Sequence, residues 1–274
     1  MSAAVIDARR SGGAAFAHAF VLGWRETWAV PGALAGLFLA LTVLLSMWAS
    51  LFRLLPGAAL ERIGLQSETL VWYLAVAEIV AFSIGYAYRD IQDEIKNGGV
   101  SAYLTKPLGY VYLVAAQELG RMSAKIAALA LPGAAVAFAL THQLPLRLGA
   151  VLPLALSIAA GAGLLLALQI AIGLSTAWLG TARPLFFIVQ KFLFVLGGLV
   201  VPLDAYPRAL AAVAWLTPFP AVLYAPASAM LDGTAAHMGR LLALQAVWLA
   251  VAWVGVAALG NALERRLVRE GVCA

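Results

Sequence analysis

Charged residues are scarce in this chain. They make up 11% of its 274 residues, whereas 64% are hydrophobic and the mean hydropathy is +0.93. A soluble domain carries about 25% charged residues, because its surface must be hydrated. The composition therefore excludes an ordinary soluble fold and predicts an all-α integral membrane protein.

Cysteine and the common catalytic motifs are also lacking. The one cysteine, Cys273, leaves no intrachain disulfide and no cysteine metal cluster to expect. The sequence contains no phosphate-binding G-x-x-x-x-G-K-[ST] loop, no HExxH pair, no GxSxG elbow and no paired aspartates at metal-binding spacing. We expect no enzyme activity and no metal in this chain. The histidines, His18, His142 and His237, fall near predicted membrane surfaces or in short loops and are interpreted as solvated.

Long hydrophobic runs are what the sequence has in abundance. Each of six runs has at least the roughly 17–20 residues that a helix needs to cross about 30 Å of hydrocarbon. They are 33–51, 70–86, 122–140, 148–178, 185–201 and 241–260. We predict a single transmembrane domain over residues 1–274, with six membrane-spanning helices.

The basic residues divide unevenly between the two sides that six crossings define. Thirteen fall on the side of the two termini, and five fall on the other. The five are Arg53, Arg62, Arg147, Arg208 and Arg240. Because basic loops stay inside, both termini are predicted to be cytoplasmic. The net charge of +5 is thus a topology signal; no basic run is interleaved with aromatic residues, so no nucleic-acid partner is expected.

Residues 14–30, before the first run, have an aromatic residue at every fourth position. Phe16, Phe20, Trp24 and Trp28 share one broad face of a helix. Aromatic rings favour the headgroup level, so we expect an interfacial helix that these four side chains anchor in membrane lipid. The alternative is an ordinary amphipathic helix packed on protein.

Prolines divide the stretch 209–231 before the last run. Pro218 and Pro220 would break a continuous helix in its middle, and a seventh crossing would place the basic C-terminal segment outside. We therefore predict a re-entrant pair of short helices. Irregular backbone at membrane depth is tolerated where protein or a water-filled cavity covers it, so the segment is expected to line or plug a pathway.

The one substantial internal hydrophilic element is 89–108, between the second and third runs. It begins with a charged stretch that can form about two helical turns, and glycines 98 and 99 interrupt it, because each costs about 1 kcal/mol relative to alanine in a helix. Its residues Glu94, Ile95, Gly98, Val100, Leu104, Lys106 and Pro107 follow the pattern E-I-x-x-G-x-[VI]-x-x-x-L-x-[KR]-P. A solvated loop that only sets the topology is the alternative interpretation.

This pattern resembles the loop after the second span in the ABC-2 class of bacterial ABC transporter permeases. The resemblance implies that the loop is a coupling helix docked in a groove of a separate cytoplasmic ATPase. On that basis Glu94 would make a polar contact, Ile95 and Leu104 would pack into the groove, and Gly98 would permit the turn. It also implies a second permease, identical or homologous, and ATP with Mg on the partner ATPase, with no cofactor in this chain.

Glu78, Gln169 and Gln190 are polar residues inside the predicted spans. Glu78, near the middle of the second span, is costly in hydrocarbon and should face the interior of the bundle. It could contact a cationic substrate, or it could form a structural hydrogen bond to Gln169, Gln190 or another interior polar group. These three residues are our candidates for the substrate pathway.

The sequence thus predicts the membrane subunit of an ATP-driven ABC-2 exporter in the bacterial inner membrane. An ion-gradient transporter is the first alternative; it would be expected to carry more intramembrane charge and to show repeat symmetry between halves. A membrane-embedded lipid-modifying enzyme is the second, and it lacks an acid–base or metal constellation in the sequence. Co-purification of an ATPase would distinguish the exporter from both.

Overall fold

A computed structural model describes residues 3–54, 66–99, 109–145 and 148–269. Within these ranges the chain is helical and has no strands. The longer helices are α1 (Ala3–Trp28), α2 (Pro31–Leu54), α4 (Ser67–Phe82), α6 (Tyr110–Thr141), α7 (Val151–Leu174), α9 (Arg183–Leu196) and α13 (Ala235–Arg269). The shorter ones are α5 (Ala87–Lys96), α8 (Thr176–Leu179), α10 (Arg208–Trp215), α11 (Phe219–Val222) and α12 (Tyr224–Ala227). Three 3-10 turns complete the set: η2 (Leu148–Ala150), η3 (Leu203–Ala205) and η4 (Ser228–Met230).

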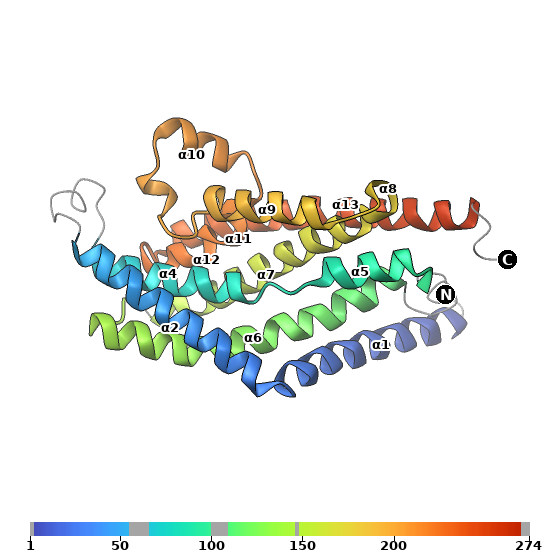
Figure 1. Ribbon diagram of the computed structural model, residues 1–274, viewed down its shortest axis with the longest axis horizontal. Coiled ribbons are helices and arrows are strands. Elements are labelled where there is room, and N and C mark those ends of the chain that lie inside the picture. Colours follow the sequence, from blue (N-terminus) through green and yellow to red (C-terminus); the bar gives the residue numbers. More distant parts are fainter. Residues whose placement is uncertain (1–2, 55–65, 100–108, 146–147, 270–274) are drawn as a thin grey trace.

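The long helices form one elongated bundle (Figure 1). The start of α1, helix α5, the turn at α8 and the end of α13 lie at one end, which we call the α5 end. Helix α10, the end of α6 and the start of α7 lie at the opposite end, the α10 end. The start of α1 and the end of α13 therefore lie on the same side of the bundle as the charged helix α5.

Five helical segments of the described residues are long and apolar enough to cross a membrane. They are Pro31–Leu54, Ser67–Lys96, Tyr110–Thr141, Leu148–Leu179 and Ala235–Leu267. The outer faces of α2 and α13 carry exposed apolar side chains, among them Leu39 at 64% and Val254 at 70%. Large exposed apolar faces are stable in lipid and would be unfavourable in water. The prediction of an all-α integral membrane protein is therefore confirmed.

The sixth predicted span, 185–201, forms a shorter helix than expected. Helix α9 has 14 residues and ends before Gly197 and Gly198, the second of which has a positive φ of 70°. At 1.5 Å per residue it reaches about 21 Å, less than the roughly 30 Å of a hydrocarbon core. The count of six spans therefore stays a prediction.

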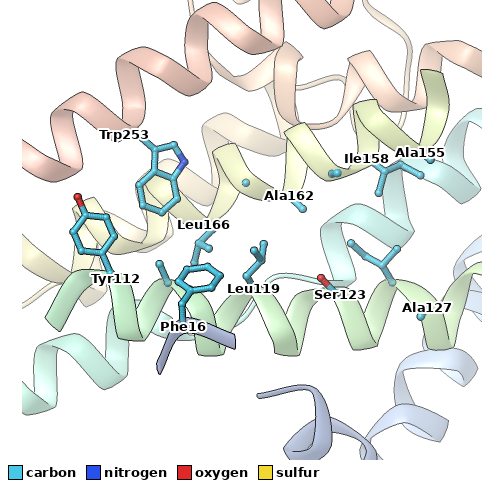
Figure 2. A pocket seen from close by; sticks show the side chains of 14 residues that line it. Phe16, Tyr112, Leu119, Ser123, Ala127, Ala155, Ile158, Ala162, Leu166 and Trp253 are labelled. Atoms are coloured by element: carbon cyan, nitrogen blue, oxygen red, sulfur yellow. The ribbon is translucent and has the colours of Figure 1, made fainter. Parts of the chain in front are cut away.

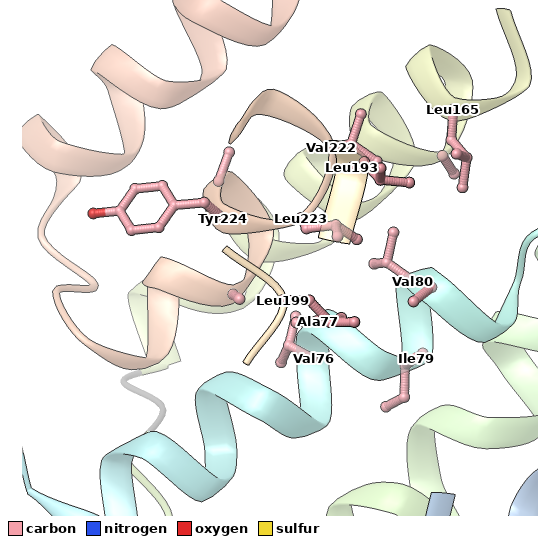
Figure 3. Packing of buried hydrophobic residues seen from close by; sticks show 14 of the residues in the cluster. Val76, Ala77, Ile79, Val80, Leu165, Leu193, Leu199, Val222, Leu223 and Tyr224 are labelled. Carbon is pink, nitrogen blue, oxygen red and sulfur yellow. The ribbon is translucent and has the colours of Figure 1, made fainter. Parts of the chain in front are cut away.

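Helix α4 lies at the centre of the bundle and is apolar on every side. It packs against α2, α6, α7, α12 and η4, and nearly all of its residues are buried. Figure 3 shows Val76, Ala77 and Val80 of α4 beside Leu199 and Leu223. Apolar residues lie on every side of α4 and are buried on every side, as is typical of a helix in the core of a bundle.

The proline-containing stretch 209–231 is broken into short helices, as its prolines predict. Pro218 caps α11 and Pro220 lies in its first turn. The two parts of the stretch differ, because α10 is largely exposed whereas residues 220–230 are buried among α4, α7, α9 and α13. This covering of irregular backbone by protein meets the physical requirement for a re-entrant segment; its depth in a membrane stays a prediction.

Helix α1 packs along the first half of α6. A Cβ on Gly23 would lie 1.9 Å from the backbone oxygen of Gln117, and a Cβ on Gly120 would lie 2.1 Å from that of Phe20. These two glycines therefore let the backbones of α1 and α6 touch. Of the predicted aromatic face, Phe16 and Trp28 are exposed, whereas Phe20 and Trp24 are half-buried. The helix thus has a protein contact that the interfacial interpretation did not include.

Candidate functional site

Helix α5 is held against the bundle by a small apolar face. Ala87, Tyr88 and Ile91 are buried, and the rings of Tyr88 and Phe186 stack with centroids 4.2 Å apart. A Cβ on Gly173 of α7 would lie 2.8 Å from the Cβ of Ile91, so α5 approaches α7 as closely as a glycine permits. Movement of α5 must therefore move α7 and α9 or break this packing.

A side-chain clamp fixes the same helix to the turn between α8 and α9. The Gln92 Oε1 atom accepts hydrogen bonds from the backbone nitrogen of Ala182, at 2.8 Å, and from Thr181 Oγ1, at 3.1 Å. The turn begins at Gly180, which has a φ of 73°. Through this clamp α5 contacts the start of the helix that leads to the buried, broken segment 220–230.

On its other side α5 is tied to α1 and α6 by charge. The Arg121 guanidinium of α6 lies 2.9 Å from Glu26 of α1, 3.1 Å from Asp90 of α5 and 3.0 Å from Glu118 of its own helix. Gln117 donates hydrogen bonds to both Glu26 carboxylate oxygens. We call these five residues the Arg121 cluster. It links three helices that are far apart in the sequence.

The carboxylates of the Arg121 cluster differ strongly in exposure. The Glu118 side chain is 3% exposed, whereas those of Glu26 and Asp90 are 39% and 59% exposed. Gly85, in the break between α4 and α5, makes room for Glu118, since a Cβ there would lie 1.3 Å from Glu118 Oε1. A charge buried this deeply depends on its partner, so Glu118 is the member that most needs Arg121.

The end of α5 has the turn that the motif predicts. Gly98 has a φ of 72°, is exposed, and has open space where a Cβ would be. The Glu94 carboxylate lies against Gly99, whose Cβ would approach Glu94 Oε2 to 1.9 Å. Ile95 is half-buried against the core of the chain itself, so only part of its surface remains for a partner. Val100, Leu104, Lys106 and Pro107 lie outside the described residues.

An open polar cavity of about 570 Å³ lies beside α5. Asp90, Asp93 and Glu94 line one wall, and Tyr110 and Gln117 are among the residues of the other. In the part of the chain that the structure describes, no group of three or more His, Cys, Asp and Glu residues could hold a metal ion. The arrangement suits a protein contact, with a polar surface next to an apolar anchor.

The three polar residues predicted for the pathway are not joined to one another. Glu78 and Gln169 are buried at 5% and 4% exposure, and Gln190 is half-buried. Gln169 Oε1 has no hydrogen-bond partner among the described residues. Both interpretations of Glu78, a contact with a cationic substrate and a structural hydrogen bond to Gln169, Gln190 or another interior polar group, stay predictions.

Two residues that hold helices together were not among the predicted site residues. Gln245 of α13 is 1% exposed and donates hydrogen bonds to the backbone oxygens of Ser157, at 2.9 Å, and Ala221, at 2.8 Å. It thereby fixes α11 to α7 and α13. Its position in a predicted span was the available signal, as it was for Glu78. Arg121 is the other; it is one of the thirteen basic residues assigned to the side of the termini, and Glu118 three residues earlier on the same helix was the available signal for a pair.

These features define a multi-pass membrane protein with a charged helix at one end of its bundle. The chain matches the family model described as ABC-2 family transporter protein over residues 33–265, which is most of its length. It belongs to that family, the membrane subunits of ABC transporters. No curated protein and no solved structure gives a significant match.

Proposed function

We propose that this chain is the permease subunit of an ATP-driven exporter, with ATP hydrolysed by a separate ATPase docked at α5. The observation that carries the proposal is the attachment of α5. A short charged helix at one end of the bundle contacts α7 and α9 through its apolar face and α1 and α6 through the Arg121 cluster. A displacement of α5 would therefore be transmitted directly to α1, α6, α7 and α9.

The direction of each helix supports six crossings. Helices α2, α6 and α9 run toward the α10 end, and α4, α7 and α13 run in the opposite direction, toward the α5 end (Figure 1). Helix α9 is short, but α13 could not return to the α5 end unless α9 had first left it. We place the α5 end in the cytoplasm of a bacterial inner membrane, because thirteen of the eighteen basic residues belong to that side.

The substrate pathway is proposed to form between this chain and a second permease, identical or homologous. The buried broken segment 220–230 is the element proposed to open or close the pathway; Gln245 of α13 holds it to the bundle through the backbone oxygen of Ala221. Glu78, Gln169 and Gln190 are the proposed polar contacts inside. Export is the proposed direction, in keeping with the resemblance of the coupling motif.

The test is reconstitution with and without the partner. Purification from native membranes should yield an ABC ATPase at one copy per permease, and Asp93→Arg on the exposed face of α5 should weaken that association more than Arg208→Asp at the α10 end. Liposomes that hold both proteins should transport only with ATP. Uphill transport by the permease alone on an ion gradient would overturn the proposal.

A further inference from the structure

A large apolar groove lies between α6, α7 and α13 (Figure 2). Its volume is about 670 Å³, within the roughly 300–1,000 Å³ typical of ligand sites. Small residues of α7, among them Ala155, Ala159 and Gly163, leave the space open, and Phe16 of α1 borders it. We call it the α7 groove.

The α7 groove changes character along its length. Its inner part is aliphatic, whereas Tyr112, Trp253 and Phe16 gather at one end (Figure 2). Tyr112 and Trp253 also border a second cavity of about 250 Å³, which continues to Asn261 and Glu264 of α13. One continuous lining therefore passes from aliphatic residues, through amphipathic rings, to an amide and a carboxylate.

The order of these surfaces along the two cavities matches the order of environments across a membrane, from hydrocarbon through the headgroup level to water. The aliphatic part is formed by helices that can cross a membrane, whereas Asn261 and Glu264 follow directly on the predicted span 241–260. Tyrosine and tryptophan favour the headgroup level, which is the level between these two parts. The apolar part offers water few hydrogen-bond partners, so an apolar occupant is favoured there.

We propose that the α7 groove and the adjoining cavity bind one phospholipid that carries a primary ammonium head group. An acyl chain fills the aliphatic part, and the ammonium group lies at the Glu264 carboxylate. The Tyr112 hydroxyl and the Asn261 amide are donors available to the lipid phosphate. A carboxylate at the head-group end disfavours an anionic head group, which selects the aminophospholipid over phosphatidylglycerol.

A second copy of this chain is a weaker candidate occupant. A partner helix would have to present a cation at Glu264 and a slender aliphatic ridge beyond the aromatic rings. An aminophospholipid has this order of groups in its covalent structure, with the ammonium group at one end and the acyl chains at the other. The proposed lipid is a resident component and not the exported cargo, so this inference goes beyond the proposed function.

The site can be tested on the complete permease in nanodiscs of equal phosphatidylethanolamine and phosphatidylglycerol. Native mass spectrometry should find one phosphatidylethanolamine retained per chain. Ala159→Trp and Ala155→Trp, which fill the groove from exposed wall positions, should lose it. Leu152→Trp, on the same helix at 68% exposure and outside the lining, should keep it.

The head-group contact has a separate measurement. Glu264→Gln should lower the preference for phosphatidylethanolamine over phosphatidylglycerol by a factor of about 1.5–5, the range expected for one exposed charge pair. Glu264 is exposed, so this change should leave the fold intact. An unchanged preference would overturn the assignment of the ammonium group to Glu264.

Two results would overturn the site as a whole. One is equal lipid retention by the wild type, Ala159→Trp and Ala155→Trp. The other is efficient disulfide cross-linking between two copies carrying Ala159→Cys in a Cys273→Ser background, which would show that a second copy covers the groove. Neither measurement needs an ATPase or transport, so the outcome is independent of the proposed function.

Discussion

Replacement of Arg121 by methionine is expected to destabilise the α5 end of the bundle by about 3 kcal/mol. Methionine keeps much of the side chain's length and apolar stem but leaves Glu118, at 3% exposure, without its counter-charge. Removing one partner of a buried ion pair costs roughly 3–5 kcal/mol, and the low end applies because the Arg121 side chain is 29% exposed.

The other two ion pairs of the Arg121 cluster contribute much less. Asp90 and Glu26 are 59% and 39% exposed, and an exposed pair is worth about 0–1 kcal/mol. Asp90→Asn should therefore change stability by less than about 1 kcal/mol. Its effect should appear instead in the coupling of ATP hydrolysis to transport, since Asp90 is the only carboxylate of α5 that contacts Arg121 among the described residues.

Thermal unfolding of the purified permease in detergent would measure these differences. At about 2–4 °C per kcal/mol for a chain of this size, Arg121→Met should lower the midpoint by about 6–12 °C. Arg25→Met, an exposed cation on α1, is the matched control and should change it by little. In Arg121→Met/Glu118→Gln the buried charge is gone, so most of the loss should be recovered.

The reasoning fails if Arg121→Met unfolds at the same temperature as Arg25→Met. It also fails if the double variant is no more stable than Arg121→Met. The first result would mean that Glu118 finds another cation, for which Lys125 is the candidate, because it lies one turn along α6 and interacts with Glu118. The second would mean that the packing of the Arg121 stem, and not its charge, stabilises the three helices.

Three further changes test the coupling path. Gly98→Val should strain a backbone with φ of 72° by about 1–2 kcal/mol without a clash; ATP hydrolysis should continue while transport falls, and unchanged transport would count against coupling through this turn. Gly173→Leu should displace α5 from α7 and lower stability by about 1–3 kcal/mol in thermal unfolding, whereas Gly149→Leu, in open space, should have little effect. Glu78→Gln should lower transport without releasing the ATPase in a pull-down; full transport would indicate a structural role.

The membrane fold could be predicted from the sequence because the hydropathy and the length of a span are properties of one continuous stretch of residues. Five of the six predicted spans lie within helices long enough to cross, and the family suggested by fourteen residues of one loop is confirmed over residues 33–265. The prolines predicted the breaks in 209–231 for the same reason, since proline acts on its own turn of helix.

What the sequence by itself determined is therefore local: which segments are apolar, where helices break, and where the charge lies. Only the tertiary structure decided that α1 packs on α6 and that Arg121 joins Glu26 to Asp90. The physical reason is that these contacts depend on the relative position of helices whose contacting residues are 31 to 95 positions apart in the chain. No periodicity within one helix specifies that position, because packing across the whole bundle determines it.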